Sequence, residues 1–314
     1  MFTIGIDLGG TNVKGALVDE QGGVQEEYSC PTRAERGESD IADSIAQVIL
    51  TLSSRVERHE ISGVGVGCPG TVDDQNGIVR FAGNLPWKNY PLRQELMQRT
   101  GFCVHLGNDA NTAALAEALV GCGKDAQSIV VVTLGTGVGA GVVLGGKLLT
   151  GYTGAASELG HMVIHEGGAK CTCGRRGCLE AYASATALIR QTKAAMLADP
   201  DSLLHQIVQQ QGYVDGRTAF LAKECGDRTA GIVVEQYIEH LACGLTNIVN
   251  IFFPEIVALS GGVANQGETL LAPLRKRVRE MSFGADYAAA HTRIECCTLG
   301  YRAGVIGAAM LAKK

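Results

Sequence analysis

A strand–glycine–strand pattern that occurs twice constrains the fold of this chain more than any other feature. Residues 3–8 and 13–18 are apolar runs separated by Gly-Gly-Thr-Asn, and residues 130–134 and 138–144 are apolar runs separated by Gly-Thr-Gly. Short apolar runs bounded by glycine are typical of buried strands joined by tight turns. Two such hairpins predict a chain built from two similar halves, each of which contributes one glycine-rich turn to a cleft between them.

Both turns have the composition of a phosphate-binding loop. Glycine has no Cβ, so backbone N–H groups can approach phosphate oxygens closely. In the first turn a hydroxyl and a lysine could add donors, and an aspartate could hold magnesium-bound water. The Walker A spacing is absent, and either turn alone is also compatible with an ordinary β-hairpin. The candidate residues are Asp7, Gly9, Gly10, Thr11 and Lys14 in the first turn and Gly135, Thr136, Gly137 and Gly139 in the second.

A cysteine-rich loop follows the second hairpin. Cys171, Cys173 and Cys178 stand close together, with His161 and His165 just upstream. Three thiolates and one imidazole are a standard ligand set for tetrahedral zinc, although the spacing is not that of a zinc finger. A disulfide with one spare thiol, or three ordinary buried cysteines, are the alternatives. Either histidine could be the fourth ligand on spacing alone. The loop predicts a structural zinc site.

Two carboxylates flank this loop. Glu158 lies three residues before His161, and Glu180 lies two residues after Cys178. A metal that fixed the loop would also fix these carboxylates, which accept hydrogen bonds from a polyol more readily than they pack against apolar groups. Asn84, in a loop bounded by glycine and proline, is a further candidate for a polar ligand contact. The zinc loop is therefore expected to shape a binding site.

Asn108 and Asp109 lie where a strand that begins at residue 104 meets an alanine-rich helix. Aspartate is among the best helix N-caps, so capping is one explanation of this residue. A general base is the other, because the positive end of the helix lowers the cost of keeping the carboxylate ionised. The local sequence does not separate the two.

Further elements follow from apolar spacing. We predict an amphipathic helix over 41–52, a long helix near 230–250 and a buried strand over 256–260. Gly261 and Gly262 follow this strand, where they permit either the close approach of a flat ligand such as adenine or a tight turn into the next helix.

Four predictions concern packing alone. The polar stretch 199–216 is expected at the surface, and residues 300–312 are expected to form an apolar helix that packs on the N-terminal domain. Trp87 is assigned to packing, and Cys296 and Cys297 are predicted to be core thiols in a terminal strand.

The composition argues against several classes of protein. With 314 residues, 46% of them hydrophobic, the chain can bury a substantial core and is not expected to be disordered. A formal net charge of −5 gives no support for nucleic-acid or anionic-membrane partners. We find neither a secretory leader nor an apolar run of about 20 residues. Eleven cysteines in such a chain are typical of a reducing compartment, so we expect a cytoplasmic protein.

Six motifs occur along the chain in one order. They are Asp-x-Gly-Gly-Thr-x-x-Lys at 7–14, Asn-Asp-Ala-Asn at 108–111, Leu-Gly-Thr-Gly-x-Gly at 134–139, Glu-Leu-Gly-His at 158–161, Cys-x-Cys-Gly-x-x-Gly-Cys-x-Glu at 171–180 and Ser-Gly-Gly at 260–262. This series resembles the ROK family of repressors and sugar kinases, within the actin/hsp70/hexokinase superfamily. The resemblance covers nearly the whole chain and implies an α/β fold with two ribonuclease-H-like lobes. Residues 1–108 with 300–314 would form the smaller lobe, and residues 109–299 the larger lobe with the zinc loop and a helical insertion.

The resemblance also implies a role for each candidate residue. Asp109 matches the catalytic base, and Asp7 would orient the Mg²⁺ that accompanies ATP. The sugar hydroxyls would be held by Asn84, Asn108, Asp109, Glu158, His161 and Glu180. The ATP phosphates would lie between Gly9, Gly10 and Thr11 on one side and Gly135, Thr136 and Gly137 on the other, with Gly261 and Gly262 beside the adenosine. Structural Zn²⁺ would be held by His161, Cys171, Cys173 and Cys178, which selects His161 over His165.

The activity implied by the resemblance is ATP-dependent phosphorylation of a hexose hydroxyl. Glucose is the expected substrate, because Asn-Leu-Pro-Trp at 84–87 and Pro-Leu-Arg at 91–93 resemble the glucokinase branch. Fructose, allose, N-acetylmannosamine and N-acetylglucosamine are alternative substrates. Family repressors carry a helix-turn-helix domain before the first phosphate motif, and only six residues precede Asp7, so a repressor is less favoured. A sugar-binding protein without catalysis is a third alternative. Family members are commonly dimers or tetramers, so a homo-oligomer is expected.

Overall fold

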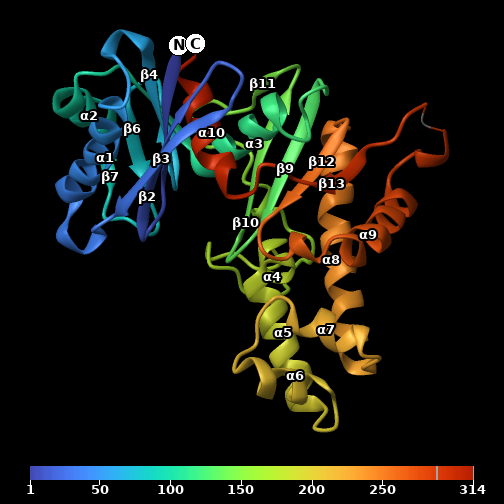
Figure 1. Cartoon of the computed structure of the whole chain (residues 1–314). Helices are drawn as coiled ribbons and strands as arrows, with labels where there is room; N and C mark the ends of the chain where they lie inside the picture. The colour runs from blue at the N-terminus through green and yellow to red at the C-terminus, as the bar shows by residue number, and fades with distance from the viewer. Residues whose placement is uncertain (288, 314) are drawn as a thin grey trace. The chain divides into compact units, whose positions relative to one another are not determined.

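The structure is a computed structural model that describes residues 1–287 and 289–313. Its internal contacts group the chain into two compact units. The first unit comprises Met1–Val131, Gly141–Ser157 and Cys297–Lys314, and the second comprises Val132–Ala140 and Glu158–Cys296. Figure 1 labels most of the helices and strands.

A five-stranded sheet with the order β3-β2-β1-β4-β8 forms the centre of the first unit (Figure 1). Its strands are β1 (Phe2–Leu8), β2 (Asn12–Val18), β3 (Val24–Pro31), β4 (Ile61–Cys68) and β8 (Val104–Asn108). β1, β2 and β3 pair in antiparallel fashion, whereas β4 and β8 extend the sheet in parallel. Within the first hairpin Asp7 lies opposite Lys14. The structure confirms this predicted hairpin.

Helices cover both faces of this sheet. Ile4 and Ile6 of β1 join the apolar cluster that includes α1 (Glu38–Ser53) and α2 (Leu92–Thr100). Gly5, between them, points to the opposite face, where α10 (Ala303–Leu311) packs against α3 (Asp109–Val120). A Cβ on Gly5 would lie 1.8 Å from the Val305 carbonyl oxygen, and a Cβ on Gly65 would lie 1.7 Å from the Ala308 carbonyl oxygen. Glycine is required at both positions because the helix backbone lies directly on the sheet. The predicted packing of the last helix is confirmed.

A small sheet of three short strands, β5 (Thr71–Asp73), β6 (Ile78–Phe81) and β7 (Lys88–Tyr90), was not predicted. Strands of three or four residues are too short to show a periodic apolar pattern. Trp87 precedes β7 and is 1% exposed. Its ring stacks on Tyr90 with centroids 4.9 Å apart, and its indole N–H donates to the Glu38 carbonyl oxygen at 3.3 Å. The predicted packing role of Trp87 is confirmed.

The second five-stranded sheet has the order β11-β10-β9-β12-β13. Its strands are β9 (Ser128–Leu134), β10 (Val138–Leu144), β11 (Lys147–Leu148), β12 (Ile256–Ser260) and β13 (Arg293–Cys296). The second predicted hairpin and the predicted strand over 256–260 are thus confirmed. The prediction for the terminal cysteines was partly wrong. Cys297 follows β13 rather than lying in it, and both Cys296 and Cys297 are half-buried, because the strand lies at the edge of the sheet.

Helices make up most of the remaining second unit: α4 (Glu180–Ala183), α5 (Ala185–Ala198), α6 (Leu204–Gln211), α7 (Thr218–Glu224), α8 (Arg228–Phe252) and α9 (Glu268–Met281). The predicted long helix is α8, and the Asp227 side chain caps it by accepting from the Ala230 N–H. The stretch 199–216 is not only surface, because it contains α6, whose Leu204 is buried against Ala222 and Ala230. Neither α8 nor any other helix in the described part of the chain is long and apolar enough to cross a membrane.

The predicted lobes divide the chain at a different place from these two units. The prediction assigned residues 109–299 to the larger lobe, whereas contacts place α3 in the first unit. The reason is that α3 packs along α10. The lobe boundaries therefore stay a prediction.

Candidate active site and metal centre

Asn108, not Asp109, caps helix α3. The Asn108 side-chain oxygen accepts from the Asn111 N–H at 3.1 Å, and its amide nitrogen donates to the Gly70 carbonyl oxygen at 3.0 Å. Asp109 is the first residue of the helix, and its carboxylate accepts from the Ala110 N–H at 2.8 Å. Because Asn108 already caps the helix, Asp109 is not needed for capping. The tertiary structure thus removes the main alternative to a chemical role for Asp109.

Asp7 and Asp109 interact electrostatically. Desolvation raises the pKa of Asp7 above its ordinary value and the Asp109 carboxylate raises it further, while Lys14 lowers it. Desolvation also raises the pKa of Asp109, against hydrogen bonds from the Ala110 N–H, its own N–H and the Asn108 side chain, which lower it. Asp109 nonetheless keeps surface that water can reach. Desolvation and partial exposure of Asp109 are compatible, because the surrounding protein can displace bulk water while one side of the carboxylate stays open.

Thr32, the residue directly after β3, stabilises the first glycine turn. Its hydroxyl donates to the Gly9 carbonyl oxygen at 2.7 Å, and its N–H donates to the Thr11 carbonyl oxygen at 2.9 Å. Gly10 and Thr11 remain exposed. A Cβ on Gly10 would lie 3.4 Å from the side-chain nitrogen of Asn84. The fold therefore brings the predicted sugar ligand Asn84 beside the predicted phosphate turn. Thr32 was not predicted, since a single threonine after a strand carries no sequence signal.

The second glycine turn is tied to helix α5. The Gly135 N–H donates to the Gly137 carbonyl oxygen at 3.0 Å, and the Gly135 carbonyl oxygen accepts from the Ala185 N–H at 2.8 Å. Thr136, at the tip, is exposed. Gly139 lies inside β10 rather than in the turn. Open space surrounds Gly135, where an added Cβ would meet no atom within 4 Å.

Gly261 and Gly262 lie next to this turn. Gly261 has φ of +89°, and a Cβ on it would lie 2.4 Å from the Leu134 carbonyl oxygen, one residue before Gly135. Only glycine allows this close approach together with a left-handed backbone. At Gly262 an added Cβ would meet no atom within 4 Å. The predicted adenosine contacts and the predicted second phosphate turn are thus neighbours within the second unit.

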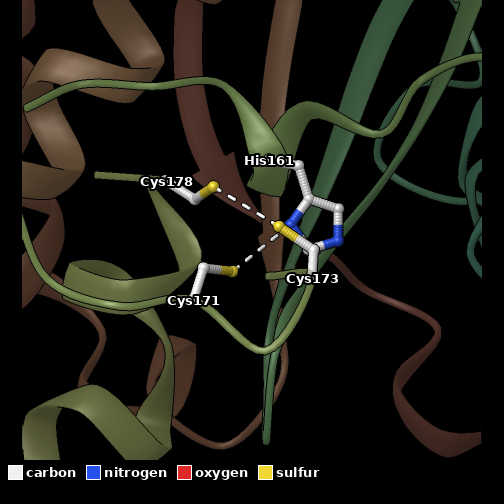
Figure 2. Close-up of side chains that lie close together, drawn as sticks. All are labelled: His161, Cys171, Cys173 and Cys178. Carbon is white, nitrogen blue, oxygen red and sulfur yellow. Dashed lines mark hydrogen bonds between the residues drawn. The ribbon is translucent and has the colours of Figure 1, made fainter. Parts of the chain in front are cut away.

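Four side chains of the cysteine-rich loop converge as a metal-type cluster (Figure 2). Their ligand atoms all lie within 4.8 Å of one another. The Cys171 sulfur is 3.6 Å from His161 Nδ1, and the sulfurs of Cys173 and Cys178 are 3.7 Å apart. A Zn–S bond of about 2.3 Å places two tetrahedral sulfur ligands about 3.8 Å apart. A disulfide would need about 2.05 Å. The cluster fits a tetrahedral cation and is no disulfide.

The structure also distinguishes the two histidines of this loop. His161 points its Nδ1 at the thiols (Figure 2). His165 is outside the cluster and stacks on Tyr182, with ring centroids 5.9 Å apart. Gly177 allows this arrangement, since it has φ of +85° and an added Cβ would lie 1.8 Å from the His165 carbonyl oxygen.

Glu180 connects the cysteine-rich loop to the second glycine turn. One carboxylate oxygen accepts from the Thr172 hydroxyl at 2.8 Å, and the other accepts from the Val138 N–H at 3.1 Å. Gly160 packs against the same strand, because an added Cβ would lie 2.0 Å from the Val138 carbonyl oxygen. Glu158 immediately precedes the 3₁₀ turn that carries Gly160 and His161. The loop and the turn therefore form one connected structure.

Two contacts of the Asp7 and Asp109 pair were not predicted. Cys68, at the end of β4, is buried, and desolvation with the nearby Asp109 charge raises the pKa of its thiol. Gly304, in the first turn of α10, lies against Asp7, because an added Cβ would be 2.8 Å from the carboxyl carbon. The glycines of the last helix, Gly304 and Gly307, were the sequence feature that could have indicated this close contact.

Comparison with known proteins gives one consistent result. A sequence profile described as "ROK family" matches residues 3–314. A glucokinase of Thermotoga maritima is 41% identical over 315 residues, which cover 99% of this chain and 97% of that protein. A ROK family glucokinase from Streptomyces griseus, solved in complex with glucose and AMPPNP, superposes with a TM-score of 0.83 at 33% identity, covering 100% of this chain and 99% of that one. The xylose repressor of Caldicellulosiruptor bescii is 33% identical over 79% of this chain and 61% of its own length. The structural match confirms the predicted α/β fold of the actin-like ATPase class.

Proposed function

Because the chain belongs to the ROK family, we propose that it is an ATP-dependent hexose kinase whose substrate is glucose. The observation that carries this proposal is the Asp7 and Asp109 pair. Asn108 takes over helix capping, so the Asp109 carboxylate, with its raised pKa, is available for chemistry. A carboxylate with a raised pKa is, in its ionised form, a stronger base than an ordinary carboxylate.

Asp109 would act as the general base. A sugar hydroxyl is a weak nucleophile, so its proton passes to the carboxylate as the oxygen attacks the γ-phosphorus in line. The bond between the γ-phosphorus and the β–γ bridging oxygen of ATP breaks, the γ-phosphoryl group passes to the sugar oxygen, and ADP leaves. Backbone N–H groups of the two glycine turns would stabilise the charge on the transferring phosphoryl group. Mg²⁺ bound with ATP would neutralise phosphate charge, and Asp7 is the residue proposed to orient it.

The remaining ligand roles are proposals of the same kind. In the first unit Gly9, Gly10 and Thr11 are proposed to hold phosphate, with Lys14 beside Asp7. In the second unit the proposed nucleotide contacts are Gly135, Thr136, Gly137, Gly139, Gly261 and Gly262. The proposed sugar ligands are Asn84, Asn108 and Asp109 in the first unit and Glu158, His161 and Glu180 in the second. The proximity of Asn84 to Gly10 and of Glu180 to Val138 supports the pairing of sugar and phosphate ligands within each unit.

We propose that His161, Cys171, Cys173 and Cys178 hold a structural zinc ion. The support is the donor set and the separations of 3.6 and 3.7 Å within it. Zinc bound there would fix the loop that carries Glu180. Metal analysis of purified protein tests this proposal, with one zinc per chain as the expected result.

Assembly and location are also proposed. Phe253, Phe283 and Tyr287 of the second unit are 59%, 95% and 94% exposed, which supports a homo-oligomer, dimer or tetramer, because exposed aromatic groups favour association. None of the eleven cysteines, all of which lie in the described residues, is in a disulfide, which supports a cytoplasmic location. Light scattering at micromolar concentration measures the assembly, and a monomer throughout would contradict it.

The activity is tested by following ADP release with Mg·ATP and a panel of sugars. The panel contains glucose, mannose, fructose, allose, N-acetylglucosamine and N-acetylmannosamine. We expect glucose to give the highest kcat/KM. A different dominant sugar would keep the kinase and change its substrate. No turnover with any sugar, from folded protein shown to contain zinc, would contradict the kinase and favour a sugar-binding protein without catalysis.

A further inference from the structure

Glu117 is a buried carboxylate outside the proposed catalytic set. It lies near the end of α3 and is 0% exposed. It accepts four hydrogen bonds: one from the Cys122 N–H at 3.0 Å, two from the N–H and hydroxyl of Thr298 at 3.2 Å each, and one from the Leu299 N–H at 2.9 Å. Burying a carboxylate is costly unless donors of this kind satisfy it. Glu117 thereby joins the turn after α3 to the segment that leads into α10.

One of the two helices joined in this way, α3, carries Asp109, and the other, α10, packs against Asp7 of β1. Asp109 is the first residue of α3, and Gly304 in the first turn of α10 lies against Asp7. The helices touch through their backbones, since a Cβ on Gly307 would lie 1.7 Å from the Thr112 carbonyl oxygen. A helix pair in such close contact transmits a displacement as a rigid body. A shift of α10 along α3 would therefore change the spacing of Asp7 and Asp109.

A metal site is the other explanation of this carboxylate. The sulfurs of Cys122 and Cys297 and a Glu117 oxygen all lie within 4.8 Å of one another. However, a cation would face a carboxylate whose oxygens already accept four hydrogen bonds. These three residues would also leave a tetrahedral zinc ion one protein ligand short of a closed structural site. The hydrogen bonds therefore explain the burial of Glu117 better than a metal does.

We propose that Glu117 is a positioning residue for catalysis: through Cys122, Thr298 and Leu299 it sets the register of α3 against α10, and so holds Asp7 and Asp109 at their working separation. This inference rests on the proposed kinase function for its kinetic consequence, but its structural claim stands apart from activity.

Glu117→Gln tests the proposal. The glutamine amide presents N–H groups where the carboxylate accepted hydrogen bonds, so the Thr298 or Leu299 donors lose their partner. We expect kcat to fall on the order of 10- to 100-fold, because small misplacements of reacting groups have effects of this size. We also expect a higher Mg²⁺ concentration at half-maximal rate, since Asp7 would be displaced. Glu117→Asp, which keeps the charge but is shorter, should recover part of kcat.

Thr100→Val is the matched control for lost stability. Thr100 is equally a buried polar residue of the first unit, and its hydroxyl donates to the Leu96 carbonyl oxygen at 2.7 Å. It touches neither α3 nor α10 through that bond. We expect it to lower the Tm without changing kcat or the Mg²⁺ requirement. If Glu117→Gln lowered the Tm to the same extent and likewise left both kinetic quantities unchanged, the positioning role would be wrong and Glu117 merely structural.

Hydrogen exchange tests the structural claim without any turnover. In Glu117→Gln the backbone amides of residues 109–112 and 303–307 should exchange faster, whereas in Thr100→Val they should not. Unchanged exchange in both segments overturns the inference even if the enzyme is active. If the wild-type protein is inactive on every sugar, the proposed function is wrong. Hydrogen exchange then still tests whether Glu117 fixes α3 against α10. If Glu117→Gln does not fold, Thr298→Val removes one of the four donors and should give the same effects at smaller size.

Discussion

The two glycine-rich turns are built alike but are held in different ways. The first turn is held by Thr32, and its sheet is packed against α10 through glycines that let backbone touch backbone. The second turn is held by Glu180 of the cysteine-rich loop, whose own shape depends on four side chains that converge as metal ligands. The first region thus derives its order from packing and hydrogen bonds within the chain, whereas the second is expected to require a bound ion as well. Each of the following predictions tests one side of this contrast.

The largest effect is expected from Cys178→Ser, which removes a ligand from the second region. Zinc binding in small structural sites contributes about 10–16 kcal/mol in apparent terms, so loss of one ligand should unfold the loop. We expect loss of zinc, protease cleavage within residues 158–180 and loss of turnover. Cys225→Ser, at an exposed cysteine of the same unit, is the control and should behave as wild type. Full zinc content and activity in Cys178→Ser would show that Cys178 is not a ligand and that the second turn does not depend on it.

Asp109→Asn tests the first region without breaking its packing. The amide is isosteric and Asn108 still caps the helix, so the fold and sugar binding should be retained. We expect kcat to fall on the order of 100- to 10,000-fold, the usual contribution of a general base. Single-turnover kinetics and calorimetric sugar binding measure the two effects separately. Near-normal turnover would take Asp109 out of the catalytic role.

Gly65→Ala breaks the backbone packing of the first region. Its Cβ would lie 1.7 Å from the Ala308 carbonyl oxygen, so α10 must move. Overpacking of this kind typically costs about 1–3 kcal/mol, which thermal or urea unfolding can measure. Gly63→Ala in the same strand is the matched control, since its Cβ would lie 3.4 Å from the nearest atom, an ordinary contact. Equal stability of both variants would show that helix and sheet are not in tight contact there.

The smallest effect concerns pH. The pKa values of Asp7 and Asp109 are raised above the ordinary carboxyl value of 3.8. Because the base must be ionised, we expect the rate to decrease on acidification already at a pH higher than 3.8. Lys14 lowers the pKa of Asp7. Lys14→Met therefore raises that pKa, and the acid limb of the kcat/KM profile should move to higher pH. A shift to lower pH, or none, would contradict an effect of Lys14 on the ionisation of Asp7.

Much of the site was predictable, and the failures have a common cause. The hairpins and the metal-ligand residue types appear as local patterns, because glycine spacing and cysteine spacing are properties of short segments. The short strands β5, β6 and β7 and the helix α6 were missed, since their apolar residues are too few to show a period. Glu117 and Thr32 were missed because their partners lie elsewhere in the sequence: Glu117 is bonded to Thr298 and Leu299, far along the chain.

The amino-acid sequence by itself determined the two glycine hairpins, the residue types of the metal cluster and the order of motifs that places the chain in its family. Spacing alone left the choice between His161 and His165 open; the family resemblance pointed to His161, and the tertiary structure places His161 with the cysteines. Only the tertiary structure decided that Asn108 rather than Asp109 caps α3. The physical reason is that local conformation follows from neighbouring residues, whereas the choice between two equivalent side chains depends on which one long-range packing brings to the partner. Glu117 shows this dependence on long-range packing most clearly, because a carboxylate is stable in the interior only where the fold places hydrogen-bond donors around it.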